Sequence, residues 1–281
     1  MASAAQQKES TTDVLDTLPV FPEVVLRLHE LVEDDNTTIP QMADLISTSP
    51  ALLAELLRYV NSPRYSMGQE VTSAHIAVGV IGRHAVTSLL TTSALRETFT
   101  GFNCSQVTMA DFFRYGVAVA ATLDVIAEAD DVELDGEAIA MGVLHNLGEL
   151  ALIHAQGDDF VRGLRLAPDA ATTSRYQLAV DLYGLDFYAV GSALMRKWGL
   201  PEIYCDTAAS IPEGSRCLRP EEQVTALRKA IAHTRINHAI CPRWWLSQAQ
   251  EFSPGLIDGA TVGEILEEST ERHERLANLL V

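Results

Sequence analysis

The stretch AIAMGVLHNLGELAL, residues 138–152, carries a histidine beside an asparagine in the middle of an almost wholly apolar run. Its length corresponds to about four helical turns, and the run predicts a buried helix over residues 136–156. A metal enzyme prefers a carboxylate beside such a histidine, because an amide cannot neutralise a bound dication. The stretch therefore leaves three alternatives for His145: a working metal site, a former one, or a core helix.

Apolar stripes at helical spacing recur along most of the chain. One begins after Pro22, and others predict helices over residues 111–128, 172–182, 187–198 and 221–240. Helix start signals occur at Thr38 with Gln41, at Ser49 before Pro50, and at Thr261 with Glu264. The alternation of apolar and polar residues that is typical of strands is nowhere sustained. The predicted fold class is all-α.

Composition restricts the class of protein further. The chain has 281 residues, of which 47% are hydrophobic and 21% charged, as expected of a globular protein of one or two domains. Its four cysteines, Cys104, Cys205, Cys217 and Cys241, form no CxxC pair, which favours reduced thiols. No uninterrupted apolar stretch approaches the roughly 20 residues that span a bilayer. We expect a cytoplasmic protein without a membrane partner.

The charge balance argues against nucleic-acid binding. Lys and Arg total 20 against 38 for Asp and Glu, and the net charge of −18 would repel a polyanion. Two short helices over residues 38–62 have the spacing of a helix-turn-helix, but the second helix offers only Arg58 as a phosphate or base partner.

Four motifs in a fixed order resemble the HDOD domain family. The first is LPVFPEVVLRLHELVEDDNTTIPQMADLISTSPALLAELLRYVNSPRY from Leu18, with a Leu-Pro-x-x-Pro entry and an Asn-Ser exit. The others are VTSAHIAVGVIGRHAVTSLL from Val71, the stretch from Ala138, and VGSALMRKWGLP from Val190. The resemblance implies an HD-superfamily-like helical bundle, related to the His-Asp metal phosphohydrolases and found in bacterial signalling proteins.

The resemblance also implies a division of the chain. Residues 1–17 are expected to be a flexible N-terminal segment, and residues 18–211 an HDOD domain of two helical lobes, about 18–100 and about 108–211. Residues 212–281 would form a C-terminal helical extension, which carries an amphipathic stripe at Val224, Leu227 and Ile231.

Carried over residue by residue, the metal positions of the His-Asp hydrolases are largely replaced in this chain. Asn146 stands where the paired aspartate is expected, and Tyr115 and Phe187 stand where histidines are expected. A further His-His pair would fall near Ser210 and Ile211, and no histidine occurs between His154 and His233. We interpret Tyr115, His145, Asn146, Glu149 and Phe187 as vestigial site positions without a metal.

Compensating ligands remain an alternative. Glu149 follows His145 by four residues, so on one continuous helix the two side chains would share a face and could chelate one ion. His233 and His238 are a poor chelating pair at their spacing. Trp244 and Trp245 predict either a partly buried anchor between helices or an exposed patch for a protein partner.

Two functional hypotheses follow. The first is a non-catalytic regulatory module of the HDOD type, without a cofactor, which binds a signalling protein or a small ligand and could self-associate. The second is a divergent metal-dependent phosphohydrolase acting on a nucleotide or cyclic dinucleotide through His145 and Glu149. The sequence does not name the input signal or the partner.

Overall fold

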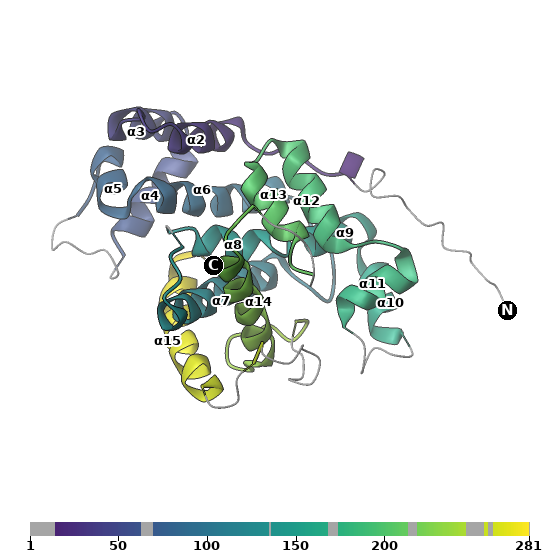
Figure 1. Ribbon diagram of the computed structural model, residues 1–281. Coiled ribbons are helices and arrows are strands. Elements are labelled where there is room, and N and C mark those ends of the chain that lie inside the picture. The colour runs from purple at the N-terminus through teal and green to yellow at the C-terminus, as the bar shows by residue number, and fades with distance from the viewer. Residues whose placement is uncertain are drawn as a thin grey trace.

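The computed structural model describes residues 15–62, 70–134, 136–167, 174–212, 218–245, 256–257 and 261–280. Within these ranges every regular element is a helix, which confirms the all-α prediction (Figure 1). Most of the predicted N-terminal segment, residues 1–14, lies outside them, as does Cys217. Cys104, Cys205 and Cys241 form no disulfide among the described residues.

The first helices form a layer of their own at the N-terminal end of the fold. They are α2 (Glu23–Glu33), α3 (Ile39–Ser47), α4 (Pro50–Val60), α5 (Ala74–Ile81) and α6 (Arg83–Thr98). Two of the three predicted start signals are confirmed, since Thr38 and Gln41 form a capping box and the Ser49 side chain accepts from the amide of Leu52. After α4, the Asn61 side chain accepts from the Val71 amide at 2.7 Å and donates to the Val71 carbonyl at 2.8 Å.

The remaining helices begin with the long helix α7. They are α7 (Met109–Asp130), α8 (Ala138–Leu144), α9 (Leu147–Gln156), α10 (Asp158–Leu166), α11 (Arg175–Tyr183), α12 (Phe187–Trp198), α13 (Glu202–Ala209), α14 (Glu221–Ile236) and α15 (Val262–Leu280). Helices α8, α14 and α15 all pack on α7. Helix α14 ends four residues before the predicted boundary at 240, because Asn237 has an extended backbone.

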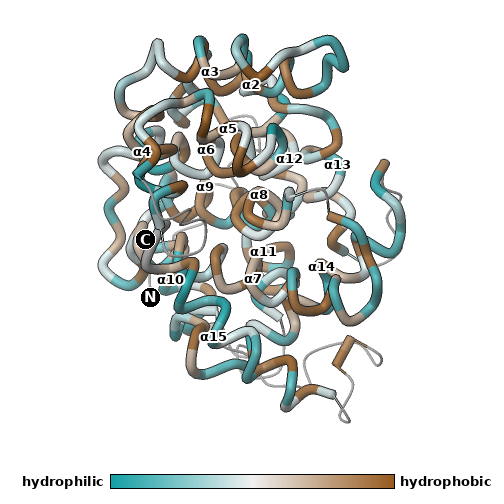
Figure 2. The backbone as a smooth tube through the Cα atoms, turned by 90° about the vertical axis from the view of Figure 1, so that its left-hand side faces the viewer, coloured by the Kyte–Doolittle hydropathy of each residue, from teal (hydrophilic) through white to brown (hydrophobic). Residues whose placement is uncertain are grey.

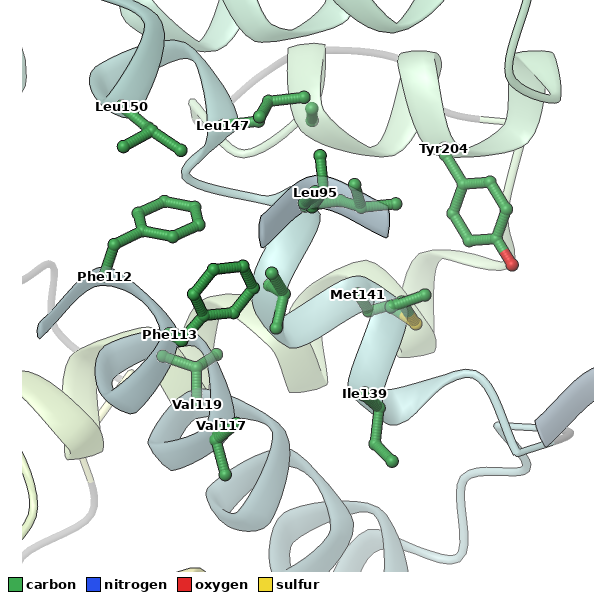
Figure 3. Close-up of a cluster of buried hydrophobic side chains, with 14 of the residues drawn as sticks. Leu95, Phe112, Phe113, Val117, Val119, Ile139, Met141, Leu147, Leu150 and Tyr204 are labelled. Carbon is green, nitrogen blue, oxygen red and sulfur yellow. The ribbon is translucent and has the colours of Figure 1, made fainter. Parts of the chain in front are cut away.

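The hydrophobic core joins the two groups of helices. Figure 3 shows labelled side chains of α6, α7, α8 and α9 gathered around one interior cluster, with Leu95, Phe113 and Leu147 among them. Figure 2 places apolar stretches of α6 and α8 in the middle of the molecule. The first and last family-like motifs also meet, because the indole N–H of Trp198 donates to the Pro19 carbonyl at 2.8 Å and Trp198 stacks on Phe21.

The predicted helix over residues 136–156 is interrupted. Helix α8 ends at Leu144 and α9 begins at Leu147, with His145 and Asn146 in the turn between them. The turn allows α9 to approach α12 so closely that a Cβ added to Gly148 would lie 1.6 Å from the carbonyl oxygen of Phe187. The packing of α9 on α12 therefore outweighs the continuous helical pattern of the sequence.

The apolar run also bears on membrane insertion. Counted together, Ala138–Gln156 is long and apolar enough to cross a bilayer, although the longest uninterrupted apolar stretch is shorter. In the fold, 89% of that window is buried. Helices α11 and α12 pass the same test only as a pair bent by 83°. Core helices of soluble proteins have this composition, so the burial is consistent with a soluble protein.

Candidate functional site

The predicted site is organised around the carboxylate of Glu149. Its side chain lies in the first turn of α9 and is fully buried. Oε1 accepts from Arg175 Nε at 3.1 Å and from Trp244 Nε1 at 3.1 Å, while Oε2 accepts from Trp245 Nε1 at 2.7 Å. Both tryptophans of the CPRWWLSQ segment therefore donate to the same carboxylate, which lies 95 residues before Trp244 in the chain.

The surroundings keep Glu149 ionised. Burial alone would raise the pKa of its carboxyl group, but Arg175, the Trp245 N–H and Arg235 outweigh burial and hold that pKa below its usual value. A buried carboxylate is tolerated only when charged partners and hydrogen-bond donors compensate its lost hydration. The internal guanidinium groups supply that compensation here.

Tyr115 occupies the same region from α7. Its hydroxyl accepts from Arg235 Nε at 2.9 Å, and its ring lies parallel to that of Trp245 with centroids 4.7 Å apart. Burial raises the pKa of Tyr115, so the phenol stays neutral. A buried neutral phenol that accepts from an arginine is a poor substitute for a histidine ligand.

His145 is a hydrogen-bonded core histidine. Its Nδ1 lies 2.7 Å from the Gly142 carbonyl, which assigns the ring proton to Nδ1, and its ring centroid lies 5.4 Å from that of Tyr115. Burial lowers the pKa of His145 to about 3, so the ring is neutral at physiological pH. This geometry fits the core alternative for His145. Its buried Nε2 has no hydrogen-bond partner among the described residues.

The other vestigial positions do not converge as ligands. The Asn146 side chain lies beside Glu149 in the turn before α9 and is 1% exposed. Phe187 begins α12 and packs its ring against Tyr176 and Tyr188. The hydroxyl of Ser210, where a histidine would be expected, donates to the Asp206 carbonyl at 2.7 Å. The structure thus brings Tyr115, His145 and Glu149 together and leaves the ring of Phe187 in an aromatic cluster.

Sequence reasoning missed both arginines of the site. Arg235 follows Leu227 and Ile231 at intervals of four, so the amphipathic stripe already placed it on the buried face of α14. No comparable signal marked Arg175, which reaches Glu149 and the Trp244 carbonyl from the start of α11. The exposed-patch alternative for the tryptophans is wrong, since Trp244 is 8% exposed and Trp245 is 0% exposed.

The geometry does not fit a catalytic metal. Both oxygens of Glu149 already accept from cationic or indole donors, and Arg175 and Arg235 would repel a dication beside it. The break between α8 and α9 also removes the continuous helix on which His145 and Glu149 were expected to chelate together. Across the described ranges, no group of three or more His, Cys, Asp or Glu side chains is placed to hold a metal ion.

Comparison with known proteins identifies the class of fold. A protein of Treponema pallidum (strain Nichols) is 24% identical over 204 residues, which cover 70% of this chain and 38% of that protein. Two solved structures share the fold, a proposed phosphohydrolase of Shewanella amazonensis SB2B and a proposed signal-transduction protein of Marinobacter aquaeolei VT8. The first has a TM-score of 0.69 with 22% identity and covers 96% of this chain and 98% of its own. The second has a TM-score of 0.72 with 20% identity, and the match covers 99% of this chain and 62% of the Marinobacter chain.

The all-helical architecture is consistent with a bundle of the HD-like class. Within that class the HDOD domain family matches residues 18–212, more than half of the chain, and the chain belongs to this family. Helices α14 and α15 lie beyond the matched residues. The chain spans well under half the length of its curated relative from Treponema.

Proposed function

We propose that this protein is a non-catalytic regulatory module that acts by binding a signalling protein. One observation carries the proposal: the buried carboxylate of Glu149 is neutralised from within the chain by Arg175 and by two indole N–H groups. Three of the roughly four lone-pair sites of this carboxylate are thus occupied by donors from the chain, which disfavours a catalytic cation. The helical scaffold remains as a rigid body for docking.

Catalysis by a divergent metal-dependent phosphohydrolase is the competing function. It requires a metal with an open position for water, together with groups that orient the attacking water. At neutral pH the site offers a neutral imidazole, a neutral phenol and an amide, none of which replaces the missing anionic ligand. The names of structural relatives at this level of identity do not favour either function.

The two candidate functions predict different metal contents for the purified protein. The protein, purified without chelator, is expected to contain well under one equivalent of iron, manganese or zinc by mass spectrometry. We also expect no hydrolysis of phosphodiesters or cyclic dinucleotides after these ions are added. A stoichiometric metal, with hydrolysis that is lost in His145→Ala, would overturn the proposal in favour of the hydrolase.

The partner is best sought directly. We propose a cytoplasmic protein as the ligand, and self-association as a further interaction, while nucleic acid and membrane are disfavoured as partners. Capture from the native host on the immobilised protein, followed by titration with the purified partner, would measure a dissociation constant. In the Glu149→Ala variant, any loss of partner binding should match the loss of folded protein. Circular dichroism and thermal unfolding would measure that loss.

A further inference from the structure

A cavity of about 510 Å³ lies between α7, α14 and α15, and none of its lining residues belongs to the site around Glu149. Figure 1 shows α15 alongside α7 at the edge of the molecule, with α14 on the other side of α7. Since α7 belongs to the family-matched region and α14 and α15 follow it, the cavity lies where the extension meets the HDOD domain. Its volume is in the range that accommodates small ligands.

The wall of the cavity includes a buried histidine. His233 lines it and is 2% exposed. Its Nδ1 lies 2.8 Å from the Lys229 carbonyl, so Nδ1 carries the proton and Nε2 presents a lone pair. Burial lowers the pKa of His233, which keeps the ring neutral. Nε2 has no partner among the described residues, although buried acceptors are normally satisfied by a donor.

Carboxylates line the same cavity. Glu128, Asp130, Glu264 and Glu268 line the cavity, together with a single cation, Lys229. Lys229 pairs with Asp130 at 2.7 Å, and Arg272 of α15 pairs with Glu128 at 2.7 Å and with Glu268 at 3.0 Å. Four carboxylates thus face two cations. Glu264 has no ion-pair partner within the part of the chain that the structure describes.

The neighbouring surface strengthens the negative field. An adjoining, more open hollow shares Glu128 and adds Asp124, Asp131 and Glu133 at the C-terminal end of α7. A cavity with one sign of charge and low-dielectric walls concentrates ions of the opposite sign. Such a field repels anionic ligands, including phosphate esters.

The rest of the lining is apolar. Val125 and Ile126 of α7, Leu256, and Ile265 of α15 contribute aliphatic surface. A ligand that fills this space therefore needs an apolar body as well as polar N–H groups. A bare metal ion fits poorly, because three of the four carboxylates are already paired with Lys229 or Arg272.

We propose that this cavity is a binding site for a small organic cation, a protonated primary amine attached to an apolar body. The ammonium group has three donors and no acceptor, which complements Glu264 and Nε2 of His233. The apolar body lies against the aliphatic side chains of α7 and α15. The site does not depend on the proposed function, since it shares no residue with the region around Glu149.

The test compares three probes of similar shape on the full chain by isothermal titration calorimetry: 2-phenylethylammonium, 2-phenylethanol and phenylacetate. Saturable binding is expected for the ammonium, at least tenfold weaker binding for the alcohol, and none for the carboxylate. Equal or tighter binding of phenylacetate would overturn the assignment of ligand charge.

Variants locate the bound probe. Ala129 lines the cavity but is itself exposed, so Ala129→Trp should obstruct the cavity without disturbing the core and abolish ammonium binding. The matched control is Ala51→Trp at an exposed position on α4, which should bind as the parent does. Glu264→Gln should weaken binding several-fold. Unchanged affinity in Ala129→Trp would show that the cavity is not the site, whatever the metal content of the protein.

Discussion

At the scale of single residues, the carboxylate of Glu149 depends on hydrogen-bond donors and positive charges from three separate helices or segments. Arg175 comes from α11, the two tryptophans follow α14, and Arg235 acts through its charge from the end of α14. A buried ion pair of this kind adds little net stability compared with apolar residues of similar shape, but loss of one partner leaves the other buried and uncompensated.

Replacement of Glu149 by glutamine is therefore expected to lower the free energy of unfolding by about 3–5 kcal/mol. The amide keeps the size of the side chain but leaves Arg175 and Arg235 without their counter-charge. Urea titration followed by circular dichroism would measure the change. Glu202→Gln, which removes an exposed ion pair with Arg196, should cost less than about 1 kcal/mol. Similar costs for both variants would contradict the importance of burial.

Buried neutral histidines predict acid sensitivity. Burial lowers the pKa of His145 to about 3 and that of His29 to about 4 in the folded state, whereas an unfolded histidine titrates near 6.5. The unfolded chain therefore binds more protons below pH 6.5, and stability that is present above this pH is lost as the pH falls toward the folded values. We expect each group to cost about 2 kcal/mol between pH 6.5 and pH 4.5.

His29→Gln tests this pH dependence. The Nε2 of His29 lies 2.8 Å from the Thr91 hydroxyl, which itself donates to the Thr87 carbonyl, so Nε2 acts as the donor. Glutamine can donate a similar bond and does not titrate. Its unfolding free energy should therefore fall less steeply with pH than that of the parent. His75→Gln, at an exposed position, serves as the control and should retain the parental slope.

At the scale of elements, the close approach of α9 and α12 determines the shape of the site. Gly148 and Gly191 face one another, and a Cβ added at Gly191 would lie 2.9 Å from the Gly148 nitrogen. Only hydrogen-sized side chains allow this backbone contact. The contact fixes where α9 begins, and hence the direction in which Glu149 enters the interior.

Gly148→Ala should consequently destabilise the protein by about 3 kcal/mol or more, because its Cβ would overlap backbone atoms that cannot move independently. Thermal unfolding and the near-ultraviolet signal of the buried tryptophans would report the loss. Gly263→Ala on α15 meets nothing within 4 Å and should raise stability by up to about 1 kcal/mol. Two equal, small effects would argue against the tight packing of α9 on α12.

Local signals in the sequence identified most helices but not the joints between them. The capping box at Thr38 and the start of α12 at Phe187 depend on neighbouring residues, so they could be predicted. The turn at His145 and Asn146 depends on contact with α12, some 40 positions further along the chain. Such a distant contact leaves no signal in the local hydrophobic periodicity, so the turn could not be predicted. The replaced ligand positions followed from family-like motifs, whereas the Arg175 contact required the fold.

At the scale of the whole molecule, the net charge of −18 opposes binding to polyanions. The helices over residues 38–62 form α3 and α4, and Arg58 on α4 pairs with Glu55. Its charge is thus partly neutralised on its own helix.

Labelled DNA should therefore show no change in fluorescence anisotropy with this protein, even at about 50 mM salt, where phosphate contacts are strongest. Single-stranded and duplex probes should behave alike. A basic DNA-binding domain of similar size provides the positive control. Binding that weakens steeply with salt would contradict the prediction and would point to a clustered basic surface.

The guanidinium of Arg175 is covalently part of the polypeptide and does not deprotonate under physiological conditions. The charge on Glu149 is therefore balanced within the folded chain, and the proposed non-catalytic function needs no metal-loading step. A cell starved of iron or manganese would assemble the same interior as a well-supplied cell. Growth conditions that empty metalloenzymes should leave the abundance and thermal stability of this protein unchanged.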